Sequence, residues 1–323
     1  MVNSATSSLI GSDTNSAASA PASPKAYNPT IDCVRIVAAL VIALFHAGVA
    51  PAPAAEASVA FFVTTMVFFM VRKLSAGDGR ARPPIASGAL RLLRPWVVWT
   101  AIYSAAIIMN VTLKHGDLAQ SFREWLPPRG TQNQLWYLLF AAALSFALSL
   151  ISRRADIAAV IERNLLAAGA LFAVASCAAL TIWTERLLPS GLGIFLLYIP
   201  SALMGLLIFT TSRDTPRLLA VAGAATIFGV VLSASGIVGA SQLIYGVPLY
   251  LFAHFVRLPD RGYARALGGI AMSVFLVHVL VIAFVERLPF VTLAQPDGAI
   301  AVVCMSLAAA MAIRWMKLEK YLQ

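Results

Sequence analysis

Charged side chains are scarce in this 323-residue chain. Asp, Glu, Lys and Arg together make up 12% of it, whereas soluble domains have about 25%. Hydrophobic residues make up 60% of the sequence, and its mean hydropathy is +0.82. This composition excludes an ordinary soluble globular domain and indicates an integral membrane protein.

Cysteine is also rare. The three cysteines, Cys33, Cys177 and Cys304, stand in apolar runs and never in a Cys-x-x-Cys spacing. This pattern argues against a disulfide framework and a cysteine-based metal site. We therefore expect no metal, and we expect the cysteines to be small residues of the protein core.

Apolar runs of about 20 residues, the length that crosses a bilayer as a helix, recur about ten times. These runs fill most of the chain and leave no room for a soluble catalytic domain. The sequence therefore predicts an all-α integral membrane protein of about ten transmembrane helices. The expected spans are 31–49, 57–73, 94–113, 133–151, 165–183, 192–210, 217–233, 237–256, 268–286 and 297–315.

Basic residues follow the topology of these spans. Of the 24 basic residues, 18 fall in loops on the side of the N-terminus, five fall in the opposite loops, and Arg35 lies inside a span. The positive-inside rule then places both termini in the cytoplasm and predicts a multi-pass protein of the cytoplasmic (inner) membrane. The net charge of +10 is therefore a topology signal, and we expect no nucleic-acid partner.

The expected spans divide the chain into three parts. Residues 1–30 are rich in Ser, Ala and Pro and predict a disordered cytoplasmic tail. They lack the charged and apolar regions of a cleaved signal peptide, so we expect the first span to remain in the mature protein. Residues 31–316 form the predicted transmembrane domain, and residues 317–323 form a short cytoplasmic tail.

The first span contains two ionisable residues, Arg35 and His46, which are 11 residues apart. A helix turns about 100° per residue, so the two side chains share one face and lie ~16 Å apart along the axis. A charge inside the bilayer costs roughly 2.5–3.5 kcal/mol on insertion scales, which makes such residues candidates for function. The alternative is that Arg35 extends to the inner interface and His46 is a polar residue near the outer one.

At these residues the sequence begins to resemble a known family. The segment IDCVRIVAALVIALFHAG resembles the opening helix of the acyltransferase 3 family, membrane enzymes that O-acylate glycans. That family has an Arg, ten residues and then a His at this place, as Arg35 and His46 do. The segments SVAFFVTTMVFFMVRKL, ALRLLRPWVVW, NQLWYLLFAAALS and LGGIAMSVFLVHVLVI resemble later parts of the family in the right order. The resemblance covers roughly residues 31–286.

The second helix departs from the family pattern. Where the family often has an acidic residue two positions before its Phe-Phe pair, this chain has Val59, and Thr65 and Met66 stand near its Ser-Gly pair. The expected second span therefore contains no carboxylate. This difference leaves open any acceptor contact made there and suggests a divergent subfamily.

The resemblance implies acyl transfer from a thioester to a sugar hydroxyl. His46 is then the candidate base, because an imidazole titrates near neutral pH, and Arg35 lies on the donor side. Arg91 and Arg94, three residues apart before Pro95, suit the phosphates of a cytoplasmic acyl-CoA, most simply acetyl-CoA. Anchoring of a cytoplasmic loop remains the alternative for the arginines of this region. No Ser-His-Asp arrangement is visible, so direct attack by the sugar hydroxyl is simpler than an acyl-enzyme.

Three further residues are candidates for substrate binding. Trp136 begins a helix at the outer side, where an aromatic ring either stacks on a sugar or belongs to the interfacial belt. His278 lies mid-span, where either structural pairing with another helix or substrate positioning explains it. Glu286 lies two turns further outward, beside Arg287, and is either an interfacial charge or a residue that orients a base.

The sequence thus predicts an O-acyltransferase that modifies a cell-envelope or exported polysaccharide, or a lipid-linked sugar. Other proteins of envelope polysaccharide assembly are expected partners if acyl groups must be relayed outward. Two alternatives remain open at this point. One is a transporter or flippase for a sugar or lipid, and the other is a non-catalytic member of an assembly complex. No repeat is apparent between the first and last five spans, which weighs against the transporter.

Overall fold

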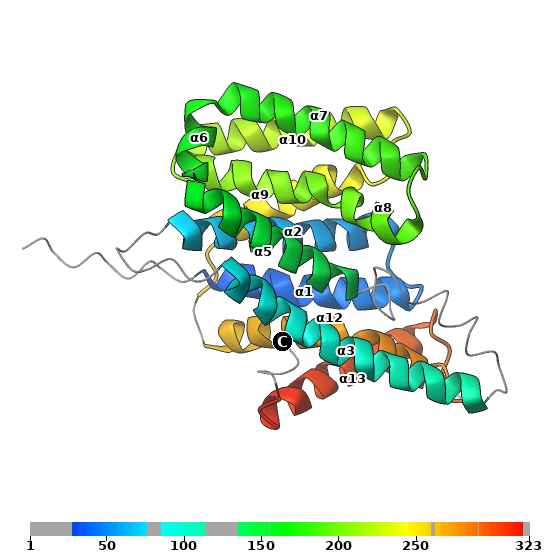
Figure 1. Cartoon of the computed structure of the whole chain (residues 1–323). Helices are drawn as coiled ribbons and strands as arrows, with labels where there is room; N and C mark the ends of the chain where they lie inside the picture. Colours follow the sequence, from blue (N-terminus) through cyan, green and yellow to red (C-terminus); the bar gives the residue numbers. More distant parts are fainter. Residues whose placement is uncertain are drawn as a thin grey trace, which may run out of the picture.

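The computed structural model describes residues 28–75, 85–113, 135–154, 156–259, 262–289 and 291–318. Every regular element in these ranges is a helix (Figure 1). The all-α fold predicted from composition is therefore confirmed. The two predicted tails lie outside the described residues, apart from residues 28–30, where the first helix begins, and residues 317–318.

Nine helices of the described part are long and apolar enough to cross a membrane, with α8 and α9 together supplying one of them. The elements are α1 (Pro29–His46), α2 (Ala52–Ser75), α3 (Ile85–Leu113), α5 (Trp136–Arg154), α6 (Ile157–Arg163), α7 (Leu165–Thr184), α8 (Ser190–Leu197), α9 (Ile199–Thr211), α10 (Thr215–Ala234), the π-helix η2 (Gln242–Gly246), α11 (Val247–Phe255), α12 (Tyr263–Val285) and α13 (Pro296–Trp315).

The span expected at 237–256 is shorter than predicted. Within this range only the residues from Gln242 to Phe255 form η2 and α11, and residues 238–240 form a turn. Gly236 and Gly239 both have positive φ, a conformation that glycine adopts without steric cost, and they turn the chain before the helix begins. The apolar run thus contains a turn as well as a helix, which its composition alone does not reveal.

The helices are stacked so that α1 lies near the middle (Figure 1). Helices α7 and α10 form one edge, and α9, α2, α1 and α12 follow towards α3 and α13 at the other edge. The pairs α1–α12, α2–α9 and α1–α2 pack together, and α5 packs on both α3 and α2. This arrangement buries about half of α1, with Asp32 and Arg35 partly covered and His46 exposed at its end.

The start of α1 is fixed by hydrogen bonds to the end of α11. The Asn28 side chain caps α1 by accepting a bond from the Thr30 amide at 3.1 Å. It also donates to the Ala253 carbonyl at 2.8 Å, and the Thr30 hydroxyl donates to the Val256 carbonyl at 2.8 Å. The last carbonyls of a helix have no hydrogen-bond partner within the helix. The bonds from Asn28 and Thr30 supply such partners at the end of α11, and they fix the position of the start of α1 relative to α11.

One sequence prediction about the core was wrong. Cys177 and Cys304 are exposed on α7 and α13, and Cys33 is only half-buried. In a membrane protein an apolar residue suits lipid as well as the core, so an apolar run does not show which side faces inward.

Candidate active site

Two imidazole rings meet where α1 ends. The rings of His46, the last residue of α1, and His278, in the middle of α12, are stacked with centroids 5.2 Å apart and planes 24° from parallel. His46 is exposed, whereas His278 is fully buried. The packing of α1 on α12 thus joins a residue from each of two helices that are far apart in the sequence.

His278 is polar but poorly satisfied. Its ring interacts with the carbonyls of Val274 and Phe275, one turn earlier. Among the described residues, however, neither ring nitrogen forms a hydrogen bond of standard geometry. A buried polar group without a hydrogen-bond partner costs about 1–3 kcal/mol of stability. Packing alone therefore does not explain why an imidazole occupies this position.

The stack also limits the charge that the pair carries. Two positive charges separated by the 5.2 Å between these rings would repel by about 3 kcal/mol at an effective dielectric constant of about 20. The geometry therefore favours at least one neutral ring. A neutral imidazole is the form that accepts a proton from a hydroxyl group.

Arg35 lies on the same face of α1 as His46, nearer the beginning of the helix. We call the end of the bundle where α1 begins the basic end. The Arg35 Nη1 donates to Asp32 Oδ1 at 3.2 Å, one turn earlier. The side chains of Arg35 and Asp32 are 32% and 16% exposed. Most of the Asp32 carboxylate is therefore covered, while part of the guanidinium remains open.

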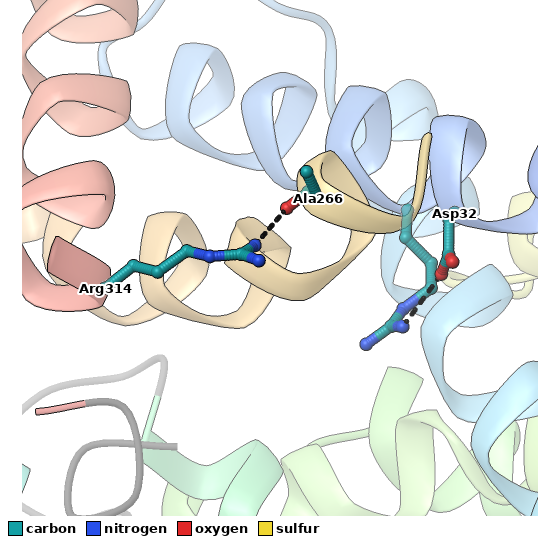
Figure 2. Close-up of polar contacts among 4 residues, drawn as sticks. Asp32, Ala266 and Arg314 are labelled. Carbon is teal, nitrogen blue, oxygen red and sulfur yellow. Dashed lines mark hydrogen bonds and ion pairs between the residues drawn. The ribbon is translucent and has the colours of Figure 1, made fainter. Parts of the chain in front are cut away.

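The first turns of α12 pack between α1 and α13 at the basic end. Asp32 of α1 approaches α12 at Gly268, where an added Cβ would overlap its carboxyl group. Arg314 of α13 donates from Nη1 to the Ala266 carbonyl at 2.8 Å (Figure 2). Figure 2 shows Asp32 and Arg314 on either side of this part of α12. Neither Arg314 nor Asp32 is among the candidate site residues predicted from the sequence.

An aromatic layer formed by Phe62, Tyr137 and Phe275 lies deeper in the bundle. The Tyr137 ring is 6.3 Å from that of Phe62 and 5.5 Å from that of Phe275. Its hydroxyl donates to Met66 Sδ at 3.6 Å. The ring centroids of Phe275 and His278 are 6.0 Å apart. The aromatic layer therefore extends to the histidine pair, and the void among its rings is too narrow for water.

A family model described as an acyltransferase domain matches residues 28–315, nearly the whole chain. The chain belongs to the acyltransferase 3 family. This membership makes the protein a membrane acyltransferase, which requires an acyl donor, and it confirms the resemblance seen in the sequence. No curated protein and no solved structure matched the chain at a significant level.

In this acyltransferase, the predicted donor-binding arginines lie on α3. Arg91 and Arg94 are both exposed, and they stand three residues apart on one side of the helix, just before the buried Pro95. They stand on a different helix from Arg35, which lies on α1. Their donor role stays a prediction, supported by exposure and spacing.

The other two substrate candidates are placed very differently from each other. Trp136 is only 5% exposed, and its ring is stacked on Tyr198 at 4.9 Å with the planes 13° apart. Glu286 is the exposed C-cap of α12, and its neighbour Arg287 donates to Asn110 Oδ1 at 3.2 Å. Neither residue joins the histidine pair, so their substrate roles also stay predictions.

The expectation that the second helix has no carboxylate was wrong. Helix α2 begins at Ala52, five residues before the expected start, and therefore includes Glu56. The Ser241 hydroxyl donates to Glu56 Oε2. The early start is possible because Pro53 lies in the first turn, where a helix tolerates proline. This carboxylate faces the α9 and η2 side of α2, since Ser241 directly precedes η2.

A groove of about 680 Å³ lies between α1, α2 and α11. Its walls are apolar, and from α1 they include Val34, Val37 and Val41. At about 100° per residue, these residues lie on the side of α1 that faces away from Arg35 and His46. The groove is therefore separate from the candidate site. In the described ranges, no three His, Cys, Asp or Glu side chains gather as a metal site would require.

Proposed function

We propose that this acyltransferase transfers an acetyl group from cytoplasmic acetyl-CoA to a hydroxyl of a cell-envelope or exported glycan, or of a lipid-linked sugar. The observation that carries the proposal is the single face of α1 that holds both Arg35 and His46, in a chain that matches the family over residues 28–315. A permanent cation at one end of the face suits an anionic donor. An imidazole at the other end suits proton transfer.

The chemistry needs a base and a leaving thiol. His46 accepts the proton of the sugar hydroxyl, and the oxygen attacks the carbonyl carbon of the thioester. A new C–O bond forms and the C–S bond breaks, so coenzyme A leaves as a thiolate that takes up the proton held by His46. The reaction needs no acyl-enzyme. The imidazole of His278 lies against the His46 ring and interacts with that ring or with the substrate through its nitrogens, and Glu286 and Trp136 contribute to the acceptor side.

Donor binding is assigned to the basic end. Coenzyme A carries several phosphate charges, and arginine binds phosphate through two parallel hydrogen bonds. Arg91 and Arg94 are exposed and lie one turn apart, which suits such contacts. The charge distribution supports a cytoplasmic location for this end, as the positive-inside rule requires. The acceptor is then met at or beyond the membrane, where other proteins of polysaccharide assembly supply it.

Incorporation of radiolabelled acetyl-CoA tests this function. Membranes that contain the wild-type chain should transfer label to envelope glycan as an ester that mild alkali releases, with one free thiol formed for each ester. Membranes without the chain serve as the control, and longer acyl-CoA donors test chain length. A wild-type chain that incorporates no label from any acyl-CoA would refute the proposal and favour the transporter alternative.

A further inference from the structure

Asp32 is the acidic partner of Arg35 in the first turn of α1. The two side chains are three residues apart and their closest atoms are 3.2 Å apart. A partly exposed pair at this helical spacing contributes only about 0.2–0.5 kcal/mol to stability. The pair is therefore a weak stabiliser of α1, and its main physical effect is to restrict the position of the guanidinium.

The neighbouring helix is shaped to receive the Asp32 carboxylate. A Cβ at Gly268 would overlap the carboxyl group of Asp32, so only glycine allows α12 to approach α1 this closely. Glycine within a helix costs about 1 kcal/mol relative to alanine. The next residue, Gly269, has the Arg314 Nη1 only 3.1 Å from where its Cβ would be. Two consecutive glycines thus make room for one charged side chain from α1 and one from α13.

We infer that Asp32 is a positioning residue, which fixes Arg35 so that the remaining N–H groups of the guanidinium bind the phosphates of the donor. The inference rests on the proposed function, because it assigns a task to Asp32 within the same site. Asp32 holds Nη1 of Arg35 and is itself held against Gly268. Arg35 is twice as exposed as Asp32, at 32% against 16%, so an anion at this site meets the guanidinium before the carboxylate.

Preorganisation explains why such a pair affects donor binding more than stability. An arginine side chain carries about 2 kcal/mol of rotamer entropy, and a ligand that must order it binds more weakly. With Asp32 in place, part of this ordering is complete before the donor arrives. Removal of the carboxylate is therefore expected to weaken donor binding and leave the chemical step unchanged.

The chain offers a matched control on α10. Asp214, the N-cap of α10, forms an ion pair with Arg217, three residues further on, at 3.0 Å. Asn is also a good N-cap, so Asp214→Asn keeps the bond that the Asp214 side chain accepts from the Arg217 amide at 3.2 Å. Their side chains are 42% and 60% exposed, and Asp214 does not adjoin any of the glycines of the described chain. The two pairs share their spacing and their charges, but only the Asp32 pair lies in the candidate site.

The test is a steady-state comparison of wild type, Asp32→Asn and Asp214→Asn in reconstituted membranes. Asn fills the same space as Asp but carries no charge. Asp32→Asn should raise the KM for acetyl-CoA about fivefold, which corresponds to about 1 kcal/mol. Its kcat, its acceptor KM and its thermal unfolding temperature should stay close to the wild-type values. Asp214→Asn should change none of these.

Each result decides a different point. If the wild type transfers no acyl group, the proposed function fails and this inference fails with it. If the wild type is active but Asp32→Asn has an unchanged donor KM, only the inference is overturned. A fall in kcat and unfolding temperature together would show a structural role and also overturn it. Asp32→Glu keeps the charge and should have a donor KM nearer to wild type than Asp32→Asn; the opposite order contradicts the inference.

Discussion

Replacement of His278 by Phe separates packing from chemistry at the histidine pair. The His278 ring is fully buried and lies 5.2 Å from the ring of His46. Phe keeps a flat ring at this position and removes both nitrogens. Because neither nitrogen forms a well-shaped hydrogen bond within the described structure, their removal should leave few partners unpaired. The ring of similar shape should cost less than about 1.5 kcal/mol.

The same site allows a calibrated comparison with Ala. His278→Ala removes a whole buried ring and leaves a cavity, and buried large-to-small changes cost about 2–5 kcal/mol. We therefore expect His278→Phe to unfold near the wild-type temperature in detergent and His278→Ala to unfold well below it. His278→Phe should nevertheless lose at least about tenfold in kcat, or about 1.4 kcal/mol. The reason is that Phe has no ring nitrogen to interact with His46 or with the substrate.

Thermal unfolding and acyl transfer should be measured on the same preparations. Full activity in His278→Phe would show that the His278 ring only fills space. It would refute the hypothesis that the buried imidazole takes part in the reaction. Strong destabilisation of His278→Phe would show instead that the ring nitrogens contribute hydrogen bonds to the fold. In both cases the histidine pair would lose its assigned role.

Three further substitutions probe the surroundings of the site. Trp136→Ala should destabilise the protein by about 3–5 kcal/mol, because the ring is almost fully buried against Tyr198. Trp136→Phe should fold normally and raise the KM for the acceptor. An unchanged acceptor KM would show that Trp136 is not part of the acceptor site. Tyr103→Phe should lower the free energy of unfolding by about 0.5–1.5 kcal/mol, since the Tyr103 hydroxyl donates to the Leu276 carbonyl at 2.6 Å. Its kcat should stay unchanged. A large loss of activity would show that this hydrogen bond is not purely structural. Arg94→Ala should raise the KM for acetyl-CoA about tenfold by loss of a charged hydrogen bond, and its unfolding temperature should stay constant. An unaltered KM would show that Arg94 only anchors the loop.

Local patterns predicted much of the first helix. Periodicity alone placed Arg35 and His46 on one face, and the structure has a single helix over Pro29–His46. Composition alone predicted the helical membrane fold. Both predictions succeed because they depend on residues within one turn or one span of each other.

Tertiary contacts were beyond the reach of these patterns. The sequence around His46 and the sequence around His278 do not predict that the two residues meet. Their contact depends on the packing of α1 on α12, which neither helix's own sequence pattern reveals. The role of Gly268 depends in the same way on Asp32, which approaches from another helix. Glu56 was missed because the apolar run begins after it, although α2 itself begins at Ala52.

The rate of His46→Ala shows whether His46 is the base of an acyl transfer. Initial rates of acetyl transfer should be compared for wild type and His46→Ala at equal amounts of folded protein. Because His46 is exposed at the end of α1, its loss should hardly change the unfolding temperature. We expect His46→Ala to lose about 10²–10⁴ in rate, the range of general base catalysis. A His46→Ala variant with the full wild-type rate would contradict this expectation.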